Sequence, residues 1–183
     1  GQRMLTIETK TTLWDEETET FVEQIVSTLD FEHSLASVSK WEGKWERPFL
    51  GKEEKTAEQV YDYLITMCQT PGVTREEILG LSEENFKQIN DYMESQQTAT
   101  TFVEQQNRRG SGVRVTAELI YYWMVAFRIP WEAQHWHINK LFALIRVCND
   151  KQDGKKQKMS RHELAQRNKD LNEQRRKQYG TSG

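Results

Sequence analysis

The histidines, which often bind metals or transfer protons, are not spaced in this chain as a metal site requires. His135 and His137 are two residues apart. On a helix this spacing points their rings about 200° apart, whereas zinc-binding helices place two histidines four residues apart. His33 and His162 have no cysteine or histidine neighbour in sequence. We therefore expect no metal ion, and ring packing or hydration for all four histidines.

The motifs of common enzymes are also missing from the sequence. Cys68 and Cys148 each end an apolar helical pattern, which favours buried small hydrophobic side chains over a nucleophile. The glycine-rich segment 109–112 lacks the lysine of a phosphate loop, and no G-x-S-x-G elbow occurs. Carboxylates cluster at turns and helix starts, where they complement the helix dipole. The sequence thus predicts a non-enzymatic protein without a cofactor.

The charge of the chain changes sign along its length. Residues 1–60 carry a formal net charge of −6, residues 61–150 carry −3 and residues 151–183 carry +6. No apolar run approaches the roughly 20 residues that cross a bilayer, and no signal-peptide pattern opens the sequence. We expect a protein without a membrane span, in which an acidic folded body is followed by a basic tail.

Two kinds of hydrophobic period predict an N-terminal β element followed by helices. Residues 4–9 and much of 21–31 alternate apolar and polar side chains around a polar turn, which predicts two or three antiparallel strands. Val38, Trp41 and Trp45 recur at helical spacing, and Pro48 ends that helix. Capping residues predict further helix starts at Thr56 with Gln59, Thr74 with Glu77, Ser82, Thr116, and Ser160 with Glu163.

The second half of the chain combines loops with its most apolar segment. Residues 96–113 lack periodicity, and a loop of this length is either functional or disordered. Residues 150–159 read as a polar basic linker. Between them we predict a helical hairpin, with one helix from Thr116 to about Arg128 and another from Trp131 to about Cys148, begun by Pro130.

The aromatic side chains of this hairpin leave two interpretations open. Seven aromatic residues fall between Tyr121 and Phe142, so apolar side chains occupy most faces of the hairpin's helices. It could be the centre of the core, covered by the other helices. It could instead present a groove for an apolar helix of a partner, because aromatic residues and methionine are enriched at recognition surfaces. The basic tail likewise suits a solvated helix, protein docking or, with less support, nucleic acid.

These patterns together predict an α+β fold that is mostly α. An N-terminal antiparallel hairpin or meander (1–32) precedes a bundle of about five helices (33–149), which together form the folded body (1–149). A basic linker and C-terminal helix (150–183) follow.

Several strings of residues resemble one family of bacteriophage proteins. They are Trp14–Thr18, Leu29–Trp45 with Pro48–Leu50, Tyr121–Met124, Ile129–Glu132, His135–His137, Leu144–Asn149, Lys158–Ser160, and Gln166–Asn168 with Arg175–Gln178. The chain resembles small proteins of the tail-gene module of phages with long non-contractile tails, which are similar to tail assembly chaperones. The resemblance covers most of the chain and weakens across residues 96–113.

The resemblance implies a chaperone that keeps the tape-measure protein soluble and recruits tail-tube subunits in the host cell cytoplasm. A homo-oligomer is compatible with it. The alternatives are a structural virion component, such as a head–tail connector or tail-tube-associated protein, and a nucleic-acid-binding accessory protein. The residues expected to bind partners are Tyr121, Tyr122, Trp123, Phe127, Trp131, Trp136, Lys155, Lys156, Lys158, Arg175, Arg176 and Lys177.

Overall fold

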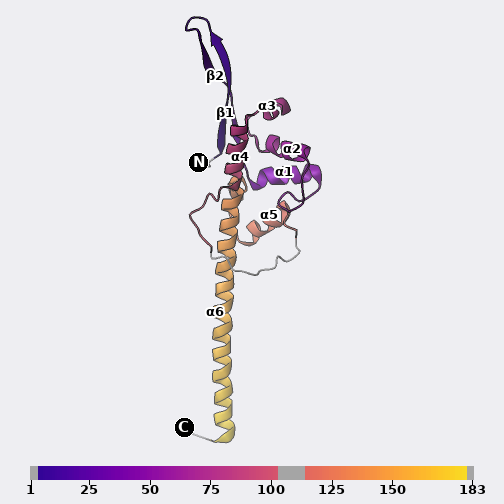
Figure 1. The fold of residues 1–183 in the computed structure, drawn as a ribbon. Helices are drawn as coiled ribbons and strands as arrows, with labels where there is room; N and C mark the ends of the chain where they lie inside the picture. The colour runs from indigo at the N-terminus through magenta and orange to yellow at the C-terminus, as the bar shows by residue number, and fades with distance from the viewer. Residues whose placement is uncertain (1–3, 103–113, 181–183) are drawn as a thin grey trace. The chain divides into compact units, whose positions relative to one another are not determined.

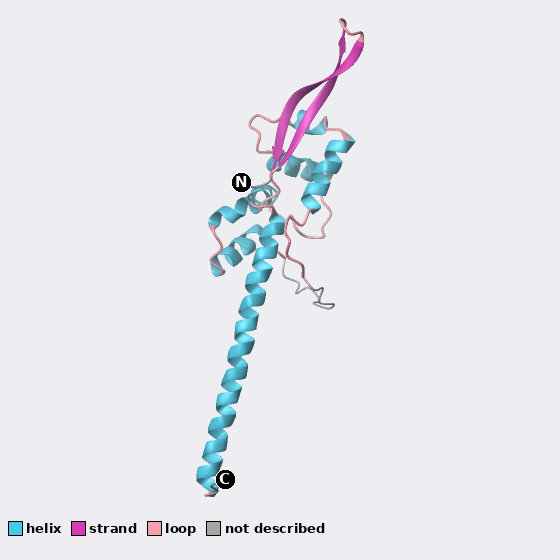
Figure 2. Cartoon of the chain, turned by 90° about the vertical axis from the view of Figure 1, so that its left-hand side faces the viewer, coloured by secondary structure: helices cyan, strands magenta, loops and turns pink. Residues whose placement is uncertain are grey.

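The computed structural model describes residues 4–102 and 114–180, except for the side chains of residues 156–160. It divides the chain into two compact units, Gly1–Ala143 and Leu144–Gly183. The fold is α+β and mostly α, as the sequence predicts, with one N-terminal hairpin followed by helices (Figures 1 and 2). In this described part, no helix combines the length and the apolar character needed to cross a membrane.

The β element is a two-stranded antiparallel hairpin. Strand β1 (Leu5–Asp15) pairs with strand β2 (Thr20–Phe31), and the register runs from Leu5 opposite Phe31 to Asp15 opposite Thr20. A bulge between Thr9 and Lys10 interrupts this register. Figure 1 shows the two strands side by side. The alternation of apolar and polar residues therefore predicted the antiparallel hairpin, but β1 extends to Asp15, beyond the predicted residues 4–9.

Side-chain caps begin most of the helices at the positions that the sequence predicts. Thr56 and Ser82 form complete capping boxes, and Thr74 and Thr116 each accept a hydrogen bond from the third backbone N–H of their helix. The helices of the described residues are α1 (Leu35–Trp45), α2 (Ala57–Met67), α3 (Arg75–Leu79), α4 (Glu83–Glu94), α5 (Ala117–Ala126), the 3₁₀ helix η1 (Trp131–His135) and α6 (Ile138–Tyr179).

The predicted helix from Trp131 to Cys148 is wrong at its start. Residues 131–135 form the short 3₁₀ helix, and Trp136 is extended with φ −68° and ψ 159°. His137 then forms a β-bridge with Ser34, and the backbone N–H of Ile138 donates to the carbonyl of His33 at 2.8 Å. Because of these contacts with a distant part of the chain, the helix begins only at Ile138.

The predicted linker at residues 150–159 is also wrong, because these residues belong to α6. The stretch contains no proline, and most of its residues are good helix formers. Its one glycine, Gly154, lowers helix stability by only about 1 kcal/mol. Ser160 therefore lies inside a helix and does not begin one. Most of the predicted loop, residues 103–113, lies outside the described residues, and residues 96–102 before it are neither helix nor strand.

The core of the first unit lies where the base of the hairpin meets α1, α2, α5 and the start of α6. Helix α1 contacts α2, α5 and η1. The predicted helical hairpin contributes its aliphatic residues to this core, but its aromatic side chains are not at the centre. The fully buried large side chains are Ile7, Leu29, Phe31, Leu35, Trp41, Tyr63, Met67, Ile78, Ile120, Met124, Ile138 and Leu141.

Candidate functional site

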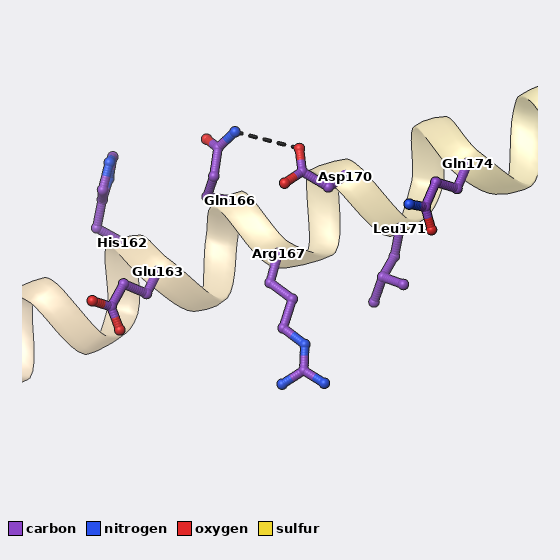
Figure 3. A pocket seen from close by; sticks show the side chains of 7 residues that line it. All are labelled: His162, Glu163, Gln166, Arg167, Asp170, Leu171 and Gln174. Carbon is purple, nitrogen blue, oxygen red and sulfur yellow. Dashed lines mark hydrogen bonds between the residues drawn. The ribbon is translucent and has the colours of Figure 1, made fainter.

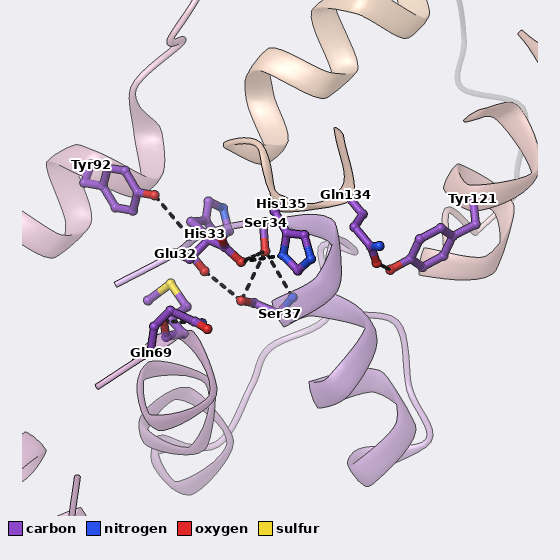
Figure 4. Close-up of polar contacts among 10 residues, drawn as sticks. Glu32, His33, Ser34, Ser37, Gln69, Tyr92, Tyr121, Gln134 and His135 are labelled. Atoms are coloured by element: carbon purple, nitrogen blue, oxygen red, sulfur yellow. Dashed lines mark hydrogen bonds and ion pairs between the residues drawn. The ribbon is translucent and has the colours of Figure 1, made fainter. Parts of the chain in front are cut away.

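A buried polar junction joins the end of β2 to the starts of α1 and α6. The carboxylate of Glu32 accepts hydrogen bonds from the Ser34 hydroxyl at 2.8 Å and contacts Nδ1 of His135 at 3.2 Å (Figure 4). The Ser34 hydroxyl also accepts from the backbone N–H of Ser37 at 3.2 Å and so caps α1. Since the Ser34 side chain is fully buried and its oxygen accepts from the first turn of α1, the arrangement suits helix capping.

Two histidines of this junction are held in the neutral form. His137 Nε2 donates to the carbonyl of Tyr92 at 2.7 Å, while its Nδ1 accepts from the backbone N–H of Asn139 at 3.1 Å, which requires a neutral ring. His33 Nδ1 bonds to the hydroxyl of Tyr63. Burial, and secondarily His137 beside it, lowers the pKa of His33 to about 3. Burial also lowers the pKa of His137 and raises that of Tyr63.

In the described part of the chain, every buried polar side-chain atom has a hydrogen-bond partner. Within the same residues, no three histidine, cysteine or acidic side chains are grouped as a metal site would require. The hydrogen bonds of the junction thus connect the end of β2 to α1 and η1 within the first unit.

A surface on α5 and η1 leaves large apolar side chains exposed, and we call it the aromatic surface: Tyr121, Tyr122, Val125 and Trp131. Tyr122 and Val125 are each 65% exposed and Trp131 is 53% exposed. The Trp131 ring lies against that of Tyr121, with centroids 4.9 Å apart. Val125 follows Tyr121 by four residues and Tyr122 by three, which makes the three neighbours on the helix.

The Tyr121 ring is fixed in this surface by a hydrogen bond. Its hydroxyl donates to the side-chain oxygen of Gln134 at 2.9 Å (Figure 4). Burial, with a smaller effect of Glu118, raises the pKa of Tyr121, so the hydroxyl remains a donor. A rigid aromatic pair beside exposed aliphatic atoms can bury apolar side chains of a partner at low cost in conformational entropy.

The other predicted aromatic residues contribute less to a binding surface. Trp123, Phe127 and Trp136 are half-buried. The ammonium group of Lys140 lies 4.7 Å from the centre of the Trp136 ring. The aromatic part of the prediction thus divides into two exposed rings, Tyr122 and Trp131, and four that are partly covered.

The predicted basic residues lie on α6, in the second unit. Lys155, Arg175, Arg176 and Lys177 are exposed, whereas the side chains of Lys156 and Lys158 lie outside the described residues. The aromatic surface belongs to the first unit and these basic residues to the second.

The comparisons with known proteins give no match. No protein-family model fits the chain, and no curated protein or solved structure matches it.

Two apolar features escaped the sequence-based prediction. A cavity of about 380 Å³ lies between α2 and α4, lined by side chains that include Phe49, Val60 and Phe86. The ammonium group of Lys55 lies over the Phe49 ring, 4.6 Å from its centre, and burial lowers the pKa of Lys55. The second feature is the end of the hairpin near its turn. The signal for it was present, since adjacent residues there, and not only alternate ones, are apolar.

Proposed function

We propose that the chain is a non-enzymatic tail assembly chaperone of a long-tailed bacteriophage, which acts in the host cell cytoplasm. It binds apolar helical segments of the tape-measure protein and recruits tail-tube subunits around them. The resemblance of its sequence to proteins of the tail-gene module supports this family of functions.

The exposed aromatic surface is the observation that carries the proposal. Monomeric proteins seldom leave aromatic and aliphatic side chains together in water unless a partner covers them. A tape-measure helix presents apolar residues three and four positions apart, which suits a surface built from Tyr122, Val125 and Trp131. The apolar cavity between α2 and α4 offers a second place for an inserted side chain.

The basic helix supports the second part of the proposal. Arg176 and Lys177 are exposed, and the segment 151–183 has a formal net charge of +6. Exposed cations accelerate the encounter with an acidic protein, and a second binding surface raises the local concentration of one partner near the other. In this proposal tail-tube subunits contact the helix while the tape-measure protein contacts the aromatic surface.

Co-expression with the tape-measure protein of the same phage tests the first part. The chain should keep that protein in the soluble fraction, and the double variant Tyr122→Ser, Trp131→Ser should fail to do so. Leu79→Ser is the matched control, because Leu79 is 47% exposed on α3, away from the aromatic surface. A tape-measure protein that precipitates equally with and without the chain would contradict the proposal.

The structural-virion alternative is tested by the mature particle. A chaperone leaves before maturation, so purified virions should lack this chain. Its presence there in a fixed ratio to the tail-tube protein would instead favour a connector or tube-associated component. Retention on DNA that disappears between low and moderate salt would favour the nucleic-acid-binding alternative.

A further inference from the structure

The half of the hairpin beyond the bulge, residues 10–26, exposes apolar side chains on both of its faces; we call it the distal arm. Leu13 lies opposite Val22 on one face, and Trp14 lies opposite Phe21 on the other. Large side chains that are 45–70% exposed stand along the arm: Leu13, Trp14, Phe21, Val22, Ile25 and Val26. An isolated two-stranded ribbon is marginally stable in water, so a surface of this kind is normally covered by another element.

The charge of the distal arm restricts what can cover it. The arm has five acidic side chains and one basic, a formal net charge of −4. Four of the five, Glu16, Glu17, Glu19 and Glu23, are exposed. Two arms placed against each other would bring like charges together, which is destabilising. The arm therefore calls for a partner that is both apolar and basic.

The last part of α6, residues 161–179, has a surface with that chemistry. Leu164 and Leu171 are seven residues apart, on the same side of the helix, and are 54% and 42% exposed. Three arginines surround them at spacings of three or four residues: Arg161, Arg167 and Arg175. We call these five residues the arginine–leucine stripe.

Acidic residues flank the stripe but are not in line with its leucines. Glu163 and Asp170 are four and three residues from Arg167, but neither they nor Glu173 is three, four or seven residues from Leu164 or Leu171. Figure 3 shows Arg167 and Leu171 on one side of the helix and Asp170 on another, where it accepts a hydrogen bond from Gln166. The stripe is thus an apolar line with guanidinium groups beside it, and guanidinium groups pair well with carboxylates.

We propose that the distal arm of one copy of this chain binds the arginine–leucine stripe of a second copy. Leu164 and Leu171 cover apolar side chains of the arm, while Arg161, Arg167 and Arg175 pair with its carboxylates. The two contacting surfaces differ, so one contact between two copies leaves the stripe of the first copy and the arm of the second copy free. These can bind each other in a reciprocal two-fold dimer, or bind further copies in a ring or an open chain.

Sedimentation velocity of the full chain over a range of concentrations tests this contact. We expect self-association that weakens with salt, since exposed charges are screened at about 0.5 M salt far more than at about 0.02 M. The double variant Trp14→Ser, Phe21→Ser should remain a monomer. Circular dichroism checks that this variant is folded.

A matched pair of charge variants locates the contact on the helix. Replacing Arg161, Arg167 and Arg175 by Gln should weaken self-association about tenfold, because three individually weak ion pairs are lost together. Replacing Lys169, Arg176 and Lys177 by Gln removes the same charge from positions outside the stripe and should change it little. Equal weakening by both triple variants would overturn the proposed stripe.

Reversed charges provide the decisive experiment. A variant with Glu16, Glu17 and Glu19 changed to Lys should not self-associate, and neither should one with Arg161, Arg167 and Arg175 changed to Glu. A mixture of the two should associate, since the basic arm of one then meets the acidic stripe of the other. Failure of the mixture to associate, or a wild-type chain that stays monomeric at every concentration and salt, would overturn the proposal.

Discussion

The two ends of the β hairpin belong to the same pair of strands but differ in what covers them. Near the helices, Ile7, Leu29 and Phe31 are at most 1% exposed. Near the turn, Trp14 is 53% exposed and Phe21 is 70% exposed. The proximal end also joins a second β-bridge, in which Phe31 pairs with Cys68 after α2. Strand formation therefore depends on local pattern, whereas the contribution of a side chain to stability depends on the elements that reach it.

Two phenylalanines of β2 provide the sharpest test of this difference. Phe31→Ala should lower the free energy of unfolding by about 3–5 kcal/mol, because it leaves a cavity in a packed core. Phe21→Ala should lower it by less than about 1 kcal/mol, since it loses mainly one exposed ring contact with Trp14. Urea unfolding of both variants measures the effects. Similar losses for the two would show that the distal arm is covered in the isolated chain.

A buried carboxylate extends the comparison to polar groups. Glu42 accepts hydrogen bonds from the backbone N–H groups of Phe49 at 2.9 Å and Ala117 at 2.7 Å. Glu42→Ala would leave both buried donors unpaired and should lower the free energy of unfolding by about 3 kcal/mol. Glu42→Gln should have a smaller effect, since one oxygen remains. Lys40→Ala, at an exposed position of the same helix, is the control and should change stability little.

Acidic pH should lower the free energy of unfolding through His33, which lies in the buried junction. The groups that face its ring are His137, Tyr63 and the hydroxyl of Tyr92 near its backbone. With a folded pKa of about 3, His33 stays neutral while the unfolded chain takes up a proton below about pH 6.5. Stability is therefore unaffected by this group above that pH and falls as pH decreases below it, by about 2 kcal/mol at pH 5.

The pH effect is checked by unfolding at pH 7.5 and pH 5. His33→Gln should reduce the difference between the two free energies, and the remaining slope should include His137, whose pKa is also lowered by burial. His162→Gln, at an exposed position of α6, should leave the difference unchanged. An unchanged difference in His33→Gln would show that His33 is not kept neutral by burial.

The outcome of the sequence-based predictions follows from how local each signal is. The caps at Thr56 and Ser82 and the alternation of the strands depend on residues a few positions apart, and the structure confirms them. The delayed start of α6 depends on His137 pairing with Ser34, and the anchoring of α5 depends on Glu42, 75 residues from Ala117. Periodicity contains no information about such distant contacts.

The same reasoning applies to the candidate binding surfaces. The aromatic residues of 121–136 could be recognised from composition, but whether they were covered could not, because that depends on which side of α5 meets α1. For the distal arm, the adjacent apolar residues gave a signal in the sequence, but they did not show whether another element covers them. An apolar residue in a strand indicates burial only when another element reaches it, and a two-stranded hairpin supplies no such element itself.

The smallest expected effect concerns α6, in which residues 150–159 were predicted to be a linker. A Cβ added at Gly154 would meet no atom within 4 Å, so Gly154→Ala introduces no clash. Because alanine restricts the unfolded chain and favours the helix, it should stabilise α6 locally by about 0.5–1 kcal/mol. Helical circular dichroism during heating should show more helix retained in the variant, while the main unfolding transition of the first unit stays unchanged.

Gly154→Pro should have the opposite effect and reduce the helical signal, because proline removes a backbone donor and clashes with the preceding turn. If residues 150–159 were instead a linker in solution, neither substitution would alter the helical signal, and α6 would be two helices.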